Sequence, residues 1–268
     1  MIYRFFNIFV LVWSIQSKPV VGRENRKWAR QINEISIKPE DTAIKVVLAG
    51  NSLRKVNEVD GRGIDEGEFD VCADIEMILD ISCSLSQRIK ERSREIVKKI
   101  TRSLLEGFSH GNNAVRIGLL TYGERYTHEL FFNNTASIDE TMDIIDKINL
   151  RRSEGDICRT YTHKALEQAV EVFKTSKHTT KIIHLYTDGL TVLRRYREDL
   201  YKIKDKLRED GVIINVIQQP HRKGKYEEEE YIELPHSADH LFKGTDPDIA
   251  NFLVDRILFD APCFDNIK

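Results

Sequence analysis

The stretch Ile75-Glu-Met-Ile-Leu-Asp-Ile-Ser-Cys-Ser84 decides the fold. Its first five residues form an apolar run of strand length, and a group of polar residues follows directly. Apolar residues at helical spacing then predict a long amphipathic helix over residues 86–108. A buried strand that leads into a long helix is the first half of a strand–helix–strand unit.

The same alternation continues toward the C-terminus. A turn at Gly123 makes the strand at 127–132 the neighbour of the strand before it. Continuous apolar strands joined by crossover helices are typical of a mostly parallel sheet that is covered on both faces. The sequence therefore predicts a doubly wound α/β fold, with one antiparallel edge strand and helices on both faces of the central sheet. Further strands are expected at 115–122, 181–186, 212–217 and 240–242, and further helices at 137–148, 162–173, 196–209 and 248–258.

The composition excludes several classes of protein. The chain has 268 residues, with 41 Lys and Arg against 43 Asp and Glu, and this balance argues against a general nucleic-acid binder. Only 14 glycines exclude a collagen helix, and 4 cysteines in this length exclude a disulfide-stapled miniprotein. No glycine-rich phosphate loop or nucleophile elbow follows a predicted strand, so we do not expect an enzyme.

The N-terminal residues 1–17 have the features of a secretory signal peptide. Arg4 precedes an apolar run of roughly 11 residues, which is shorter than the ~20 residues that a membrane-spanning helix needs. Ile15 and Ser17 occupy the −3 and −1 positions of a cleavage site after Ser17. An N-terminal anchor or a buried strand is the less favoured alternative. We expect a secreted, extracellular protein with a flexible charged leader at 18–70, a folded domain at 71–264 and a tail at 265–268. The apolar stretch 43–48 is compatible with an added edge strand.

Three polar motifs lie where the predicted strands end or in the loops beside them. They are Asp80-Ile-Ser-Cys-Ser84, Thr160-Tyr-Thr162 and Thr187-Asp-Gly189. Ligands of open α/β sheets bind at the carboxyl ends of the strands, so we expect these motifs to converge. Each motif taken alone is also compatible with hydrogen-bonded turns or a helix cap. Together they offer oxygen ligands that suit Mg²⁺, or Mn²⁺ and more loosely Ca²⁺, with a position left open for a partner's carboxylate. The candidate metal ligands are Asp80, Ser82, Ser84, Thr160 and Asp188.

The three motifs, in this order, resemble the metal-ion-dependent adhesion site of von Willebrand factor type A domains. The resemblance extends over about residues 72–263 and includes stretches outside the site, at 116–123, 165–169 and 207–212. It implies that the serines bind the ion directly, that the threonine does so in the ligand-bound state, and that the aspartates act directly or through water. It also implies a secreted adhesion or extracellular-matrix module, which binds an extracellular protein ligand that offers Asp or Glu. Ile81, Cys83 and His163 depart from the small residues that are common in the family.

The four cysteines allow three pairings. By resemblance to secreted relatives, Cys72 and Cys263 are expected to join the two ends of the domain. Cys83 and Cys158 lie beside Ser84 and Thr160 in two loops of the candidate site, so a second disulfide is inferred from proximity. Its alternative is a pair of free thiols, which an oxidising compartment disfavours.

Four other features complete the interpretation. Asn133-Asn-Thr135 is an N-glycosylation acceptor on an expected surface loop. The acidic run 227–230 and the basic run 221–225 are interpreted as solvated segments, with a weaker hypothesis of cation or heparin binding. His184 and His240 are expected to be structural or surface groups.

A metal-independent structural or interaction module with a degenerate site remains the alternative function.

Overall fold

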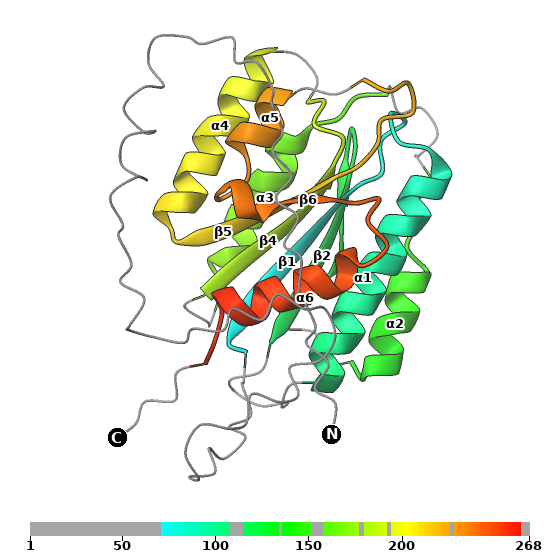
Figure 1. Cartoon of the computed structure of the whole chain (residues 1–268), viewed down its shortest axis with the longest axis vertical. Helices are drawn as coiled ribbons and strands as arrows, with labels where there is room; N and C mark the ends of the chain where they lie inside the picture. The colour runs from blue at the N-terminus through cyan, green and yellow to red at the C-terminus, as the bar shows by residue number, and fades with distance from the viewer. Residues whose placement is uncertain are drawn as a thin grey trace, which may run out of the picture. The chain divides into compact units, whose positions relative to one another are not determined.

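The computed structural model describes residues 71–107, 115–133, 136–151, 158–176, 180–191, 194–225 and 228–263. They form a six-stranded sheet with helices on both faces (Figure 1). The predicted signal peptide, the leader with its possible strand, and the tail lie outside the described residues.

The sheet has the strand order β3-β2-β1-β4-β5-β6. β2 and β3 pair in antiparallel fashion at one edge, and all other neighbours are parallel. The predicted doubly wound fold with one antiparallel edge strand is therefore confirmed. The strands are β1 (Ala73–Asp80), β2 (Arg116–Tyr122), β3 (Tyr126–Leu130), β4 (Thr180–Thr187), β5 (Val212–Gln218) and β6 (Leu241–Lys243).

The helices divide between the two faces of the sheet, and each group packs on its own apolar cluster. Residues of α1, α2 and α6 pack in one cluster, and residues of α3, α4 and α5 in the other (Figure 1). In the described ranges, no helix combines the length and the apolar composition that a bilayer-spanning segment requires. The helices are α1 (Gln87–Gly107), α2 (Ile138–Asp146), α3 (Thr162–Phe173), α4 (Arg194–Glu209), α5 (Glu228–Glu233) and α6 (Ile249–Asp260), with a 3₁₀ turn at Ala238–His240 before β6.

The start of α2 shows how local sequence sets an element boundary. The Ser137 hydroxyl accepts a hydrogen bond from the Glu140 amide at 3.3 Å, and the Glu140 carboxylate accepts one from the Ser137 amide at 2.8 Å. This capping box satisfies backbone donors that have no partner within the helix. The spacing of these two residues predicts it correctly.

The two ends of the domain are joined at the edge of the sheet where β1 begins. Cys72 and Cys263 form a disulfide across 191 residues of sequence. The Cys72 amide also donates to the Ala261 carbonyl at 3.1 Å, and Val71 forms a β-bridge with Pro262. In the chain-entropy model, a disulfide that closes a loop of this length stabilises the fold by about 5 kcal/mol.

A carboxylate lies inside the core, at the middle of β1. Glu76 is fully buried, and no described residue makes a hydrogen bond to its carboxylate oxygens. Burial raises its pKa well above the ordinary value of 4.5. A Cβ atom on Gly118 of β2 would collide with this carboxylate, so the glycine provides the space that Glu76 fills.

We expect Glu76→Gln to raise the free energy of unfolding at pH 8 and to change it little at pH 4. The folded protein holds the Glu76 proton more tightly than the unfolded chain does. The contribution of the protonated Glu76 carboxyl to the free energy of unfolding is therefore complete below pH 4.5. It is lost as the pH rises toward the pKa of Glu76 in the folded protein. The free energy of unfolding of the wild type decreases by at most about 1.4 kcal/mol per pH unit. Urea unfolding at pH 4, 6 and 8 measures it, with exposed Glu95→Gln as the control. A benefit of Glu76→Gln that is constant with pH would contradict the expectation.

Candidate metal centre

The predicted site residues gather at the carboxyl ends of β1 and β4. Asp80 is the last residue of β1, and Asp188 directly follows β4, the neighbouring parallel strand. Ser82 and Ser84 lie in the loop between β1 and α1, and Thr160 lies just before α3. The two aspartates, Ser82 and Thr160 are buried, and Ser84 is partly exposed.

The loop after β1 is shaped by short hydrogen bonds among the site residues. The Asp80 carboxylate accepts from the Ser82 amide at 2.7 Å, and the hydroxyls of Ser82 and Ser84 lie 2.7 Å apart. Burial raises the pKa of Asp188, and a side-chain hydrogen bond from Ser84 partly offsets this rise. Ser84 thus links the loop after β1 to the loop after β4.

The charged forms of both aspartates are disfavoured in the folded protein. Burial, followed by the negative charge of Asp188, raises the pKa of Asp80 to about 8. Burial also raises the pKa of Asp188. One oxygen of each carboxylate, Oδ2, is buried and accepts no hydrogen bond from a described residue. A divalent cation between these groups would compensate both charges and use both oxygens, so the residues fit such an ion.

Thr160 reaches the same edge through the end of β2. The amide of Tyr161 donates to the carbonyl of Gly123 at 3.0 Å, which holds the Thr160 loop beside the turn after β2. Thr160 and Ser84 both line a pocket of about 290 Å³. The described residues contain no cluster of three or more His, Cys, Asp or Glu side chains that would hold a metal ion. The candidate donors are therefore two carboxylates and three hydroxyls, a set of hard oxygens that suits Mg²⁺ or Mn²⁺.

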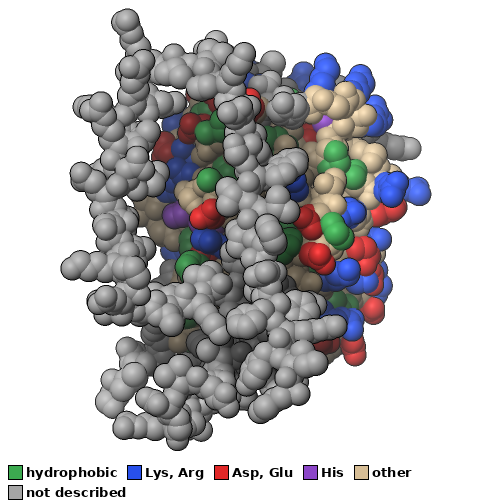
Figure 2. Space-filling view, viewed as in Figure 1, with side chains coloured by type: hydrophobic (Ala, Val, Ile, Leu, Met, Phe, Trp, Pro, Cys, Tyr) green, Lys and Arg blue, Asp and Glu red, His purple; other side chains and the backbone are tan. Residues whose placement is uncertain are grey.

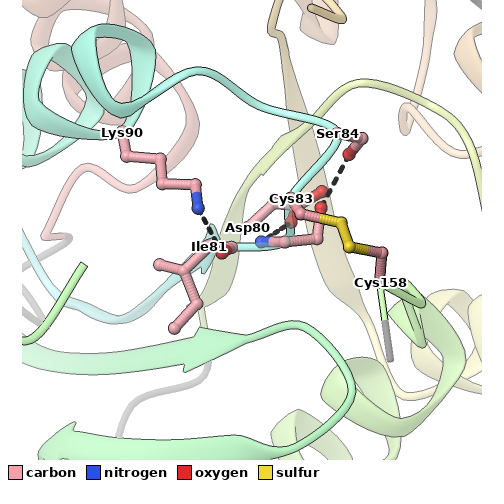
Figure 3. The surroundings of a disulfide bond; sticks show 7 residues. Asp80, Ile81, Cys83, Ser84, Lys90 and Cys158 are labelled. Atoms are coloured by element: carbon pink, nitrogen blue, oxygen red, sulfur yellow. Dashed lines mark hydrogen bonds between the residues drawn. A yellow bond between two sulfur atoms is a disulfide. The ribbon is translucent and has the colours of Figure 1, made fainter. Parts of the chain in front are cut away.

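A disulfide between Cys83 and Cys158 joins the loop after β1 to the loop before α3 (Figure 3). Cys83 lies between the two serines, and Cys158 lies two residues before Thr160. On the other side of the β1 loop, the Lys90 ammonium of α1 donates to the Ile81 carbonyl at 2.6 Å (Figure 3). The β1 loop is thus held by a covalent bond on one side and by a buried cation on the other.

The interpretation of the whole acidic run 227–230 as solvated is wrong for Glu230. This residue is fully buried on α5, and its carboxylate accepts hydrogen bonds from the Thr191 amide at 3.0 Å and the Thr191 hydroxyl at 3.1 Å. The Thr191 hydroxyl lies 2.9 Å from that of Thr162, at the start of α3. Burial raises the pKa of Glu230 to about 7. Glu230 therefore supports the loops that carry Asp188 and Thr160.

A neighbouring aromatic residue covers the turn after Asp188. The Tyr231 ring leaves no space for a Cβ atom on Gly189, whose φ is +72°, and the Tyr231 hydroxyl lies 3.3 Å from the Thr187 carbonyl. Tyr231 on α5 and Leu234, just beyond its end, are both buried, and their apolar spacing is the sequence signal that this segment packs on the core. The acidic residues of the run 227–230 instead favour a solvated segment.

Two of the three departures from the family pattern pack against other residues of the domain. His163 is buried, and its ring stacks on Tyr196 with centroids 4.7 Å apart. Ile81 packs against the apolar cluster under α1. Neither lines the pocket, whereas Cys83 does. His184 and His240 are both buried, and burial lowers the pKa of His184 to about 3.

The order of the elements and the position of the polar loops agree with the family comparison. The sequence model of the von Willebrand factor type A domain matches residues 74–255, about two thirds of the chain. The chain belongs to the von Willebrand factor type A domain family. Members of this family are mainly adhesion and interaction modules.

Solved structures of this family show the same fold. Proximal thread matrix protein 1 from the mussel byssus is 22% identical, with a TM-score of 0.55 over 71% of this chain and 46% of its own. A second structure of it, with a zinc-occupied MIDAS motif, gives a TM-score of 0.57. The manganese-loaded TRAP protein of Plasmodium vivax is 15% identical, with a TM-score of 0.56 over 73% of this chain and 75% of its own. The chain spans less than half the length of the mussel protein. Comparison with curated proteins yields no match.

Proposed function

We propose that this protein is a secreted adhesion or matrix module that binds a protein ligand through a divalent cation. The ion is held by Asp80, Ser82, Ser84, Thr160 and Asp188, and an acidic residue of the partner completes its coordination. The observation that carries the proposal is the pair of buried aspartates at adjacent strand ends, each with one carboxylate oxygen that no described residue satisfies. Mg²⁺ is the ion proposed, with Mn²⁺ or Ca²⁺ as alternatives.

The chemistry of the donors supports an ion that binds a ligand and carries out no reaction. The two carboxylates only balance the charge of a divalent ion, and the three hydroxyls are neutral. A further carboxylate is therefore a favourable ligand. Ser84 and Thr160, which line the pocket, mark the side from which a partner would approach. The proposal includes no catalytic residue.

Several features support an extracellular location. Disulfides persist in oxidising compartments, and this domain contains two. Asn133 is exposed in the turn after β3, which suits an N-glycosylation site. The secretory signal at residues 1–17, the leader at 18–70 and the boundaries 71–264 of the domain complete this proposal.

The proposal predicts that partner binding depends on the metal. A pull-down from extracellular-matrix extracts in Mg²⁺ should recover a protein partner that EDTA releases. Binding that is unchanged in EDTA would instead favour the metal-independent interaction module.

A direct measurement tests the ligand set of the ion without a known partner. Isothermal titration of Mg²⁺ or Mn²⁺ into Ser84→Ala should show an affinity at least about tenfold below that of the wild type, because one hydroxyl ligand is removed. Ser103→Ala, an exposed change on α1, is the matched control. Equal affinities for Ser84→Ala and the wild type would remove Ser84 from the ligand set.

A further inference from the structure

The loop after β5 lies against the candidate metal centre. The amide of Arg222 donates to the carbonyl of Ser84 at 2.8 Å, which fixes the loop to the one that follows β1. Within the loop, the His221 ring accepts from the Lys223 amide at 2.9 Å, and the His221 carbonyl accepts from the Gly224 amide at 2.9 Å. The φ of Gly224 is +65°, a conformation that glycine adopts without strain. The basic run 221–225 is therefore an ordered turn beside the site.

Every charged residue that lines the pocket in the described part of the chain is basic. The pocket of about 290 Å³ contains Ser84 and Thr160 together with His221, Arg222, Lys223 and Lys225. The last three are exposed, and no described carboxylate forms an ion pair with them. Figure 2 shows Lys and Arg side chains gathered at the upper end of the domain, where Figure 1 places the loop after β5.

The basic surface continues beyond the metal centre. A second pocket of about 270 Å³ shares His221 and Lys225 with the first and extends to Lys243 on β6. A bound ion would lie at one end of this surface, and the cationic side chains would extend from it toward the edge of the sheet. Opposite charges at such a rim contribute to partner selection and association rate.

We infer that the partner binds through an acidic peptide segment with more than one carboxylate. One carboxylate of the segment completes the coordination of the ion. The neighbouring acidic residues form ion pairs with Arg222, Lys223 and Lys225, and we name these three residues the basic rim. This inference rests on the proposed function and specifies the chemistry of its ligand. A protein segment is favoured over a sulfated polysaccharide for two reasons. The pocket opens onto the hydroxyls of a cation site, where a carboxylate is the preferred ligand, and the chain's net charge of −2 is unlike that of a general polyanion binder.

The test uses two synthetic peptides with blocked ends, one with a single aspartate and one with the same aspartate followed by three glutamates. Each is titrated in Mg²⁺ into the ¹⁵N-labelled full chain, and amide shifts report both affinity and location. We expect the acid-rich peptide to bind about tenfold more tightly, with shifts at residues 221–225. This preference should decrease at high salt, since exposed charge pairs are screened.

The variant Arg222→Ser/Lys223→Ser/Lys225→Ser should reduce the affinity for the acid-rich peptide to that for the single-aspartate peptide, about twofold for each charge lost. Its Mg²⁺ affinity, measured by calorimetry, should not change. Lys206→Ser, an exposed change in the last turn of α4 at the other end of the sheet, is the matched control and should keep the preference.

Three outcomes would contradict the inference that the basic rim binds acidic residues of the partner. They are equal affinities of the wild type for both peptides, an equal loss in the control, and a preference that persists in the triple variant. Heparin binding that requires the rim and ignores EDTA, without any peptide preference, would assign the surface to a sulfated polysaccharide. If neither peptide responds to Mg²⁺, the proposed function fails and the inference fails with it.

Discussion

Asp188→Asn is expected to weaken Mg²⁺ binding strongly and to stabilise the metal-free protein. The substitution removes a buried carboxylate whose own pKa is raised by burial and whose negative charge adds to the effect of burial in raising the pKa of Asp80. An asparagine keeps the side-chain oxygen that accepts from the Leu190 amide at 3.2 Å, so the turn is preserved. We expect Mg²⁺ affinity to fall by at least about 100-fold, because a charged ligand is lost. The free energy of unfolding in EDTA should rise by about 1–2 kcal/mol.

Calorimetric titration of Mg²⁺ and urea unfolding in EDTA measure the two effects. Asp255→Asn, an exposed change of the same type on α6, should alter neither. The opposite signs for binding and stability are the diagnostic result. A variant that loses both would show that Asp188 is a structural residue of the turn, and one that keeps Mg²⁺ affinity would exclude it as a ligand.

Removal of the disulfide at the site should weaken both the fold and the metal centre. We expect Cys83→Ser/Cys158→Ser to lower the free energy of unfolding by about 4 kcal/mol, the chain-entropy value for a loop closed across 75 residues. Without the covalent tether, the Thr160 loop is free to move away from the loop that carries Ser82 and Ser84. Mg²⁺ affinity should then fall by about tenfold, since ordering of the two loops opposes binding.

The second disulfide of the domain provides the matched control. Cys72→Ser/Cys263→Ser should destabilise the protein by a similar amount, but Cys72 lies at the start of β1, at the edge of the sheet opposite the site. Its loss should leave Mg²⁺ affinity unchanged under conditions where the protein is folded. Equal losses of affinity in the two double variants would indicate a general effect of stability, with no specific role for the Cys83–Cys158 bond.

Local patterns in the sequence predict most of the architecture. Apolar runs and helical spacing mark the strands and long helices, because the side-chain period of each element depends only on neighbouring residues. α3 begins and ends where its apolar spacing predicts, at Thr162 and Phe173. The strand expected to reach Phe132 instead ends at Leu130, after a register shift at Leu119 and Leu120 of β2. Pairing with a partner strand, which a local pattern does not contain, sets that boundary.

The positions of the motifs also follow from sequence, since parallel strands place their carboxyl ends at one edge. The sequence by itself determined the order of the elements and the place where Asp80 and Asp188 meet. Only the tertiary structure decided which charged residues are buried: Glu76 opposite Gly118, and Glu230 beneath Thr191. It also placed the basic turn 221–225 against Ser84. The physical reason is that burial of a charge and contact between loops depend on groups remote in sequence, whereas periodicity is a property of the local chain.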